Sequence, residues 1–529
     1  MSKIIQFSLR RNTEPQEARP TVEGLQEEVR AQAHAVEALA VDWAGREGPV
    51  TFKEFEAALR LVVFSLARVV VMLFLAGREE ALMRRHPSRV ERDGRQFRPA
   101  PAQSRALTTL FGVVRYWRIY FRETGGDDRG GFHPLDQELG LTADRFSWNV
   151  LSSGVWLALR LSFAEARTAL MRFIPDAPST EVVEQAVLGF GRHTEEWFEK
   201  QPPPAGDGEV LVMQFDSKGA PTATEEELKR RRGPRRQRQP AASRRHAGRT
   251  RRKGYSKKER RNKGDKSKNA KMATLVIMYT LRREGGQLLG PHNRRQYASF
   301  APKRRAFEVA RREADKRGFT RTSGKTVQIV TDGDNDLACY ATEYFPEAIL
   351  TIDVMHVIEK LWTAGESLNP EGSPELQQWV ELQKERLYGG QIPALLDELR
   401  QRIAAIPKTG PGNKGKRERL GQVLRYLEKR EAKLNYAELL AKDLEIGSGM
   451  VEGAVKNIIA KRCDHGGMRW IKERVEAILQ LRCIDANGDW DAFSNFVHDR
   501  LQSHAALHAT RHRLQCSTPA PLPTCAEAA

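Results

Sequence analysis

Cysteine is scarce in this sequence, and no two cysteines have the spacing of a metal-binding pair. The cysteines, five in 529 residues, show no C-x-x-C arrangement. A structural zinc site is therefore not expected. The odd cysteine count and the lack of a recognisable signal peptide fit a protein of the reducing cytoplasm.

Long apolar runs are also rare. One run, "LRLVVFSLARVVVMLFLAG" at 59–77, is long enough to raise the question of a membrane span. Arg68 lies near its middle and further charges flank it closely, so the pattern favours a buried amphipathic helix. No membrane partner is expected.

Most of the chain has no net charge. The total is +19, and residues 229–271 hold 21 Lys and Arg against two acidic residues, so the remainder is neutral. Such a segment cannot bury apolar surface and is expected to be disordered on its own. A solvated tether is one interpretation, but its density of positive charge favours contact with a polyanion, namely the phosphates of a nucleic acid. The predicted DNA-binding residues in it are Arg230, Arg231, Arg232, Arg235, Arg236, Arg251, Arg252 and Lys253.

The order of predicted elements indicates a fold. Residues 1–205 are predicted to be mainly helical, with helices over 51–98 and a small β insertion around 108–123, and are expected to recognise DNA ends. From 209 onward, apolar and β-branched runs predict three strands, a helix, a strand, a helix and a further strand. This order matches an α/β fold of the ribonuclease-H-like kind, a mixed five-stranded sheet over 206–360 and 441–500. Residues 228–272 form its basic insertion, 361–440 an all-α insertion and 505–529 a disordered tail.

In that arrangement the first and fourth strands are neighbours. "EVLVMQFDSKGA" is expected to end as a strand at Asp216, and "KTVQIVTD" ends at Asp332. The two carboxylates, 116 residues apart in sequence, are therefore expected at adjacent strand ends. Ligand sites in α/β sheets form at the carboxyl ends of strands.

The segment "TDGDNDL" at 331–337 admits other interpretations. Aspartates at alternate positions resemble an EF-hand loop, but Leu337 stands where that loop needs glycine, and a strand precedes it instead of a helix. Asp334 or Asn335 is expected to cap the following helix. Capping alone leaves Asp332 without a role.

A magnesium site needs a third carboxylate beside these two aspartates. Glu452 in "GSGMVEGAVK" is the best candidate, Glu445 is the alternative, and an ordinary first-turn glutamate is the structural interpretation of Glu452. Three carboxylates can hold two Mg²⁺ (or Mn²⁺) ions about 4 Å apart for phosphodiester chemistry. Arg469 and Trp470 in "HGGMRW" suit a phosphate contact and base stacking, with core packing as the alternative for Trp470.

Several long strings make the sequence resemble a known family. "FDSKGAPTATEEELKRRRG", "TDGDNDLA", "IDVMHVIEKLW", "KTGPGNKGKRERL", "IGSGMVEGAVK" and "HGGMRWIKERVEAILQLRC" resemble bacterial insertion-sequence transposases of the ISKra group, related to the Mutator-like superfamily. The resemblance covers about residues 205–495. Members often carry cysteines before the "PLD" string, and this chain has none there.

The resemblance implies an enzyme with an Asp-Asp-Glu (DDE) triad at Asp216, Asp332 and Glu452. It also implies that Asp353 and His356 form that superfamily's Asp-x-x-His motif. From the residues alone, this pair could orient a phosphate, hold each other in place, or cap a helix. The implied partners are the element's terminal inverted repeats and target DNA, bound by a homo-oligomer in the bacterial cytoplasm at the nucleoid. The alternatives are a metal-dependent nuclease and a domesticated DNA-binding protein.

Overall fold

The computed structural model describes residues 19–85, 89–92, 95–124, 130–226, 270–464 and 468–508. The predicted basic insertion therefore lies almost wholly outside the described residues, as does most of the predicted tail. The chain divides into two compact units, residues 1–186 with 494–529, and residues 187–493. The boundaries fall inside helices α6 (Thr180–Gly191) and α19 (Trp490–His508).

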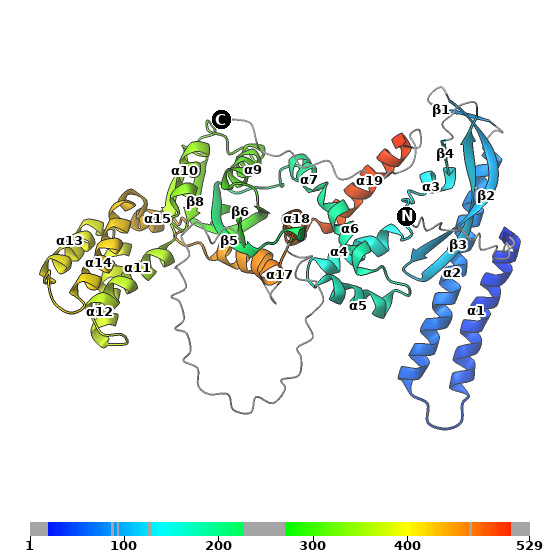
Figure 1. Ribbon diagram of the computed structural model, residues 1–529, viewed down its shortest axis with the longest axis horizontal. Helices are drawn as coiled ribbons and strands as arrows, with labels where there is room; N and C mark the ends of the chain where they lie inside the picture. The colour runs from blue at the N-terminus through cyan, green and yellow to red at the C-terminus, as the bar shows by residue number, and fades with distance from the viewer. Residues whose placement is uncertain are drawn as a thin grey trace, which may run out of the picture. The chain divides into compact units, whose positions relative to one another are not determined.

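The first unit combines helices with a four-stranded antiparallel sheet of order β1-β2-β3-β4 (Figure 1). Its elements are α1 (Val22–Ala44), α2 (Phe52–Arg85), β1 (Val90–Arg92), β2 (Arg95–Thr109), β3 (Gly112–Glu123), β4 (Gly131–Phe132), α3 (Pro134–Glu138), α4 (Trp148–Ala158) and α5 (Phe163–Phe173). A capping box in which Ser162 and Glu165 bond each other's backbone N–H groups begins α5.

The β part of this unit is larger than predicted. Helix was expected up to residue 98, but helix α2 ends at Arg85 and strand β2 already begins at Arg95. Pro99 and Pro101 argue against a strand at the level of sequence, because proline lacks the N–H that a strand interior needs. The register between β2 and β3 shifts between Ala100 and Gln103, an irregularity that tolerates proline.

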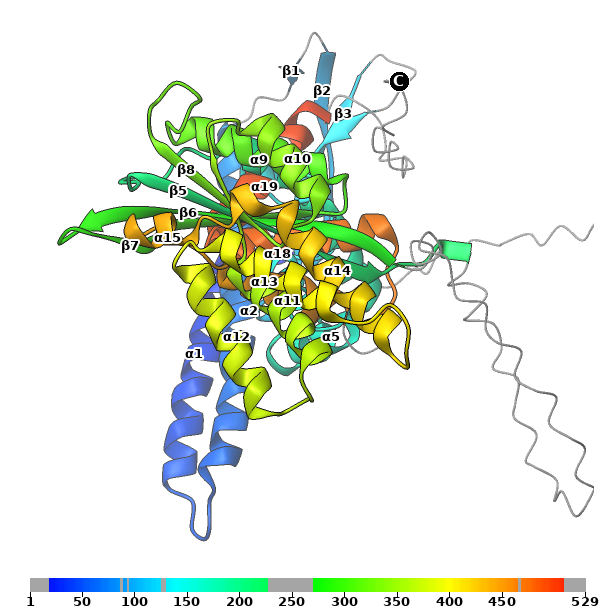
Figure 2. The ribbon, with the colours of Figure 1, turned by 90° about the vertical axis from the view of Figure 1, so that its left-hand side faces the viewer.

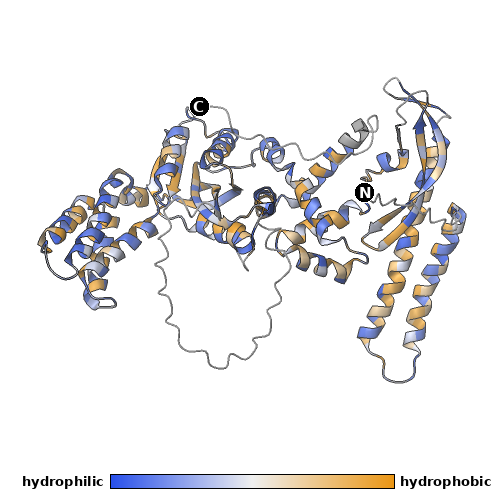
Figure 3. Ribbon diagram, in the orientation of Figure 1, coloured by the Kyte–Doolittle hydropathy of each residue, from blue (hydrophilic) through white to orange (hydrophobic). Residues whose placement is uncertain are grey.

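Helix α2 contains the apolar run at 59–77, but it is not buried as predicted. Only 6% of its most apolar 18-residue window is buried, and Figure 3 shows hydrophobic colour along much of it. Its length and composition alone would also allow it to cross a membrane, which is weak evidence because helices of soluble proteins pass the same test. Arg68 within the run donates a hydrogen bond to the Phe111 carbonyl at 3.2 Å.

The second unit is built on a mixed five-stranded sheet of order β7-β6-β5-β8-β9. Its strands are β5 (Val210–Pro221), β6 (Ala270–Glu284), β7 (Gln287–Ser299), β8 (Thr326–Thr331) and β9 (Ile349–Ile352). The β5–β6 and β6–β7 pairs are antiparallel, whereas β5–β8 and β8–β9 are parallel. The predicted mixed sheet, with its first and fourth strands adjacent, is confirmed and is consistent with a ribonuclease-H-like arrangement.

Helices precede, separate and follow these strands. They are α7 (Thr194–Lys200), α9 (Lys303–Lys316), α10 (Asn335–Tyr344), α11 (Val354–Leu368), α12 (Pro374–Tyr388), α13 (Ile392–Ala405), α14 (Asn413–Glu428), the 3₁₀ turn η2 (Glu431–Lys433), α15 (Tyr436–Ala441), α16 (Gly449–Ala454), the π-helical turn η3 (Val455–Ala460), α17 (Lys461–Cys463) and α18 (Lys472–Ala486). Between β9 and α16 the chain is thus helical, and α11 to α14 pack against one another.

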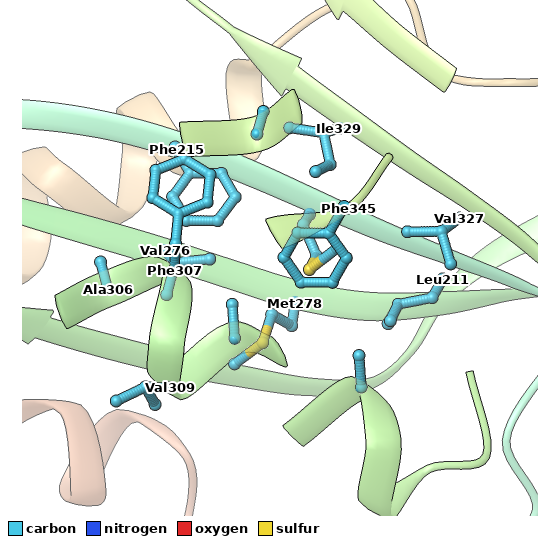
Figure 4. Packing of buried hydrophobic residues seen from close by; sticks show 14 of the residues in the cluster. Leu211, Phe215, Val276, Met278, Ala306, Phe307, Val309, Val327, Ile329 and Phe345 are labelled. Carbon is cyan, nitrogen blue, oxygen red and sulfur yellow. The ribbon is translucent and has the colours of Figure 1, made fainter. Parts of the chain in front are cut away.

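Helices α9 and α10 cover one face of the sheet (Figure 2). Phe215 of β5 and Phe307 of α9 stack there with ring centroids 3.9 Å apart. Met278, Ile329 and Phe345 belong to the same buried cluster (Figure 4). Because this cluster fixes one face of β5 and β8, the residues of opposite parity must face the other side.

We expect Phe307→Ala to destabilise the second unit by about 3–5 kcal/mol, because it removes a stacked ring from a closed core. Denaturant unfolding followed by circular dichroism measures this change. Phe173→Ala is the control, since Phe173 is 70% exposed. Equal effects of the two substitutions would contradict this packing.

Candidate active site

Three aspartates lie where parallel strand pairing stops. The pairings of β5 with β8 and of β8 with β9 end one residue before Asp216, Asp332 and Asp353. The three are therefore neighbours in register at one edge of the sheet, with about 4.8 Å between adjacent strands. Alternation places their side chains opposite the face that holds Phe215.

Strand β5 does not end at Asp216 as predicted. It continues to Pro221, because β6 pairs with it along its whole length. Only the β8 side of β5 becomes free at Asp216. The Asp216 carboxylate therefore lies beside a strand end while its own backbone stays in the sheet.

The aspartates of the 331–337 segment have separate roles. Asp332 Oδ1 accepts a hydrogen bond from the Asp334 N–H at 2.9 Å, which closes the turn over Gly333, where φ is +84°. Asp334 is the N-cap of α10 and also bonds Lys303 Nζ at 2.7 Å. Asp336 is mostly exposed and lies 3.6 Å from the same lysine. Strand β8 in front of the segment excludes an EF-hand, and Asp332 is the carboxylate left for the site.

A buried glutamine of β5 holds the segment that carries Glu452. Gln214, 1% exposed, donates to the Gly447 carbonyl at 3.1 Å and accepts from the Val451 N–H at 3.0 Å. It also donates to the Tyr279 hydroxyl at 2.9 Å. One side chain thus supplies partners for two backbone groups at the start of helix α16.

A second buried glutamine, on β8, binds the backbone of the same segment at Glu445. Gln328 donates to the Glu445 carbonyl at 2.6 Å and accepts from the Glu445 N–H at 3.0 Å. The Val354 N–H then bonds the Ile446 carbonyl at 2.9 Å. Residues 445–447 are therefore bound to β5, β8 and the start of α11 in turn.

These contacts distinguish Glu452 from Glu445. The Glu445 carboxyl is hydrogen-bonded to the Tyr279 hydroxyl, and burial raises its pKa. Glu452 instead lies 3.4 Å from Ser448 Oγ, which also donates to Asp353 at 2.7 Å. Glu452 is the glutamate that the structure brings to the strand-end aspartates.

The carboxylates act on one another electrostatically. Burial raises the pKa of Asp216, and the nearby Asp332 and Glu452 carboxylates raise it further, against a hydrogen bond from the Ser217 N–H and the charge of His356. Mutual repulsion of this kind favours a bound cation. Hard carboxylate oxygens also suit Mg²⁺ or Mn²⁺, so these residues fit the predicted ions.

Asp353 and His356 form a tight pair. His356 Nδ1 lies 2.8 Å from Asp353 Oδ2, and the Met355 N–H donates to Oδ1 at 3.0 Å. Burial alone would raise the pKa of Asp353, but the bonds from His356, Ser448 and Met355 hold it below its ordinary value. The hydrogen bond that His356 donates to Asp353 raises the pKa of His356. Asp353 thus caps α11 and orients the imidazole, leaving His356 Nε2 for a ligand.

A second geometric feature involves the same pair. One ligand atom each from Asp353, His356 and Glu452 lie within 4.8 Å of one another, close enough to share a metal ion. Asp216 and Asp332 are not members of this group. The two Asp353 oxygens already accept four hydrogen bonds, from the Met355 and Ser448 N–H groups at Oδ1 and from His356 and the Ser448 hydroxyl at Oδ2. These bonds occupy its lone pairs, so its main contribution is to hold His356 and Ser448 in place.

The other predicted site residues are placed as follows. The basic residues from Arg230 to Lys253 lie outside the described residues. Arg469 is exposed. Trp470 is 7% exposed, its ring N–H bonds the Cys463 carbonyl at 3.2 Å, and the Arg462 guanidinium lies over its ring. This burial favours core packing for Trp470 over base stacking.

Sequence reasoning missed Gln214, Gln328 and Ser448. A signal for the two glutamines was present, since each interrupts an otherwise apolar strand shortly before a candidate aspartate, in "VLVMQFD" and "VQIVTD". Polar side chains that are buried must find hydrogen-bond partners. Their partners could not be named, because they lie more than a hundred residues away in sequence.

No protein-family model matches the sequence, and no curated protein matches it. Among solved structures, the chain is similar to the Drosophila P element transposase strand transfer complex, with 10% sequence identity. The alignment covers 69% of this chain and 84% of that chain, with a TM-score of 0.20. A TM-score this low supports no conclusion about fold or activity, so the candidate site rests on its own geometry.

We expect Gln214→Leu to loosen the Glu452 segment, because the Val451 N–H and the Gly447 carbonyl lose their buried partner. Each unpaired buried group costs roughly 1–3 kcal/mol. Hydrogen exchange of peptides spanning 446–455 should become faster. Gln422→Leu, at an exposed position of α14, is the control. Unchanged exchange in Gln214→Leu would contradict the anchoring role.

Proposed function

We propose that this chain is a DDE-type transposase of the ISKra kind, which cleaves DNA at the ends of its own element and joins those ends to target DNA. The observation that carries the proposal is the convergence of Asp216, Asp332 and Glu452 at one edge of the five-stranded sheet. Three carboxylates from two neighbouring strands and a helix can hold the two divalent ions that catalyse phosphodiester chemistry.

In this proposal Asp216, Asp332 and Glu452 hold two Mg²⁺ or Mn²⁺ ions. When bound, such ions activate the attacking oxygen and stabilise the leaving oxygen of a phosphodiester. The chain itself positions the reactants. Asp353 fixes the imidazole of His356 so that Nε2 can bind a phosphate oxygen. The raised pKa of His356 favours the charged imidazolium, which attracts an anion.

DNA binding is proposed for two parts of the chain. The basic segment supplies sequence-independent affinity for phosphates. In the first unit, Arg98 of β2 and Arg122 of β3 are exposed and lie directly opposite each other. Like charges at such positions destabilise a sheet, so the pair supports an anion-binding role for this hairpin. We propose that the first unit recognises the terminal inverted repeats and that the protein acts as a homo-oligomer on DNA.

A nuclease with the same carboxylates is the second candidate. Both enzymes would cleave, but only a transposase joins a 3′ end to a target strand. Incubation of the protein with labelled element ends, a target plasmid and Mg²⁺ separates them, because a joined product appears only with the transposase. A domesticated DNA-binding protein would give neither product.

We expect Asp216→Ala and Asp332→Ala each to reduce strand transfer by more than ~100-fold, the upper range for loss of an outer-shell partner of a metal. Asp336→Ala is the matched control, since it removes a nearby exposed aspartate from the first turn of α10. Thermal unfolding should be similar for all three variants. Strand transfer by Asp216→Ala at the rate of the unmodified protein would show that the first ligand is wrongly assigned.

We expect replacement of residues 229–269 by a short Gly/Ser linker to weaken DNA binding and flatten its dependence on salt. Each lost phosphate contact lowers the slope of log K against log salt by ~0.9. The sheet should persist, because Pro221 and Ala270 are paired across β5 and β6 and a short loop can join the strands. Binding measured by fluorescence anisotropy at several salt concentrations tests this. An unchanged slope would favour the tether interpretation.

A further inference from the structure

The end of helix α14 lies against the turn that follows Asp332. Arg430, two residues beyond α14, donates from Nη2 to the Gly333 carbonyl at 2.6 Å and from Nε to the same oxygen at 3.2 Å. Nη2 also lies 3.2 Å from Asn335 Oδ1. A residue of the helical region between β9 and α16 thus fixes the backbone on which Asp332 is mounted.

Tyr426 lies beneath this contact. The Arg430 guanidinium is 4.1 Å from the centre of its ring. A Cβ atom added at Gly333 would lie 2.6 Å from the Tyr426 hydroxyl, so the hydroxyl is directed at the turn. The positive φ of Gly333 and this closeness both exclude a larger residue there.

The Tyr426 hydroxyl is buried and has no hydrogen-bond partner among the described residues. Burial raises its pKa, and the negative charges of Asp332 and Asp353 raise it further, against the charge of Arg430. The hydroxyl therefore remains a neutral donor within the field of the site's carboxylates. A buried donor without an acceptor is unfavourable, so an acceptor that came within reach of this hydroxyl would stabilise the arrangement.

Asp332 offers that acceptor. Its Oδ1 accepts from the Asp334 N–H, whereas Oδ2 has no partner in the described part of the chain. A carboxylate that binds a cation through one oxygen is commonly oriented by a donor on the other. Tyr426 is a nearby donor with unused capacity.

We propose that Tyr426 is a positioning residue for Asp332, donating a hydrogen bond to its carboxylate when a divalent cation binds, with Arg430 holding both the ring and the Gly333 turn. This inference rests on the proposed function for the presence of the cation. It assigns the helical region a direct part in assembling the metal site. Tyr426 acts through Asp332 and does not contact the reacting atoms.

The test is a titration of the full chain with Mn²⁺ in the absence of DNA, in which electron paramagnetic resonance measures the bound Mn²⁺. We expect Tyr426→Phe to raise the half-saturating Mn²⁺ concentration roughly ten-fold, the lower range for loss of an outer-shell partner. The melting temperature should not fall, because the lost hydroxyl has no hydrogen-bond partner in the part of the chain that the structure describes. Arg430→Lys, which cannot form the bidentate contact, should weaken Mn²⁺ binding in the same direction.

Tyr436→Phe is the matched control from the same helical region. Its hydroxyl is buried and donates to the Ile352 carbonyl of β9 at 2.8 Å. Its loss leaves a buried carbonyl unpaired, so the melting temperature should fall by ~2–4 °C. The half-saturating Mn²⁺ concentration of the folded variant should equal that of the unmodified protein within about two-fold, because Tyr436 does not orient a proposed ligand.

The outcomes separate the two proposals. Mn²⁺ binding that weakens in Tyr426→Phe, in a protein that joins no DNA ends, would support the positioning role and overturn the transposase. Unchanged Mn²⁺ binding in Tyr426→Phe would overturn the positioning role even if strand transfer is observed. Failure of the unmodified chain to bind Mn²⁺ would overturn it as well.

Discussion

The candidate site depends on hydrogen bonds between two buried glutamines and the backbone of one irregular segment. Gln214 and Gln328 lie on adjacent parallel strands and face the same side of the sheet. Together they bind the backbone from 445 to 451, much as a neighbouring strand would. Without them, several buried peptide groups would lack partners, at roughly 1–3 kcal/mol each. This requirement brings helix α16, and with it Glu452, to the part of β5 where its pairing with β8 stops.

The charges at the edge of the sheet divide into those that are satisfied within the chain and those that are not. Asp353 receives bonds from His356, Ser448 and a backbone N–H, and its pKa is lowered accordingly. Asp216 has a raised pKa, because burial and like charges outweigh its hydrogen bond. The first pattern is typical of a structural anchor and the second of a cation site. The distinction gives neighbouring aspartates different proposed roles.

Much of the fold could be predicted from the sequence, because periodicity and turn residues are local properties. The strands of the second unit were available in this way, and the cap of α10 was narrowed to Asp334 or Asn335, of which the structure shows Asp334. The order of the strands in the sheet was expected from the match to a ribonuclease-H-like arrangement. Errors occurred where a partner overrides local preference. Strand β2 forms despite its prolines because β3 pairs with it, and β5 continues past Asp216 because β6 does not stop there.

The sequence by itself determined which residue types follow the apolar runs of β5 and β8. The order of its predicted elements, matched to a ribonuclease-H-like arrangement, led to the expectation that Asp216 and Asp332 are neighbours. Only the tertiary structure decided that Glu452 rather than Glu445 joins them, that Asp353 is held by His356 and Ser448, and that Tyr426 faces the Gly333 turn. These facts concern which buried polar groups meet. Their partners are brought together by chain folding across long sequence separations, and no local pattern encodes that choice.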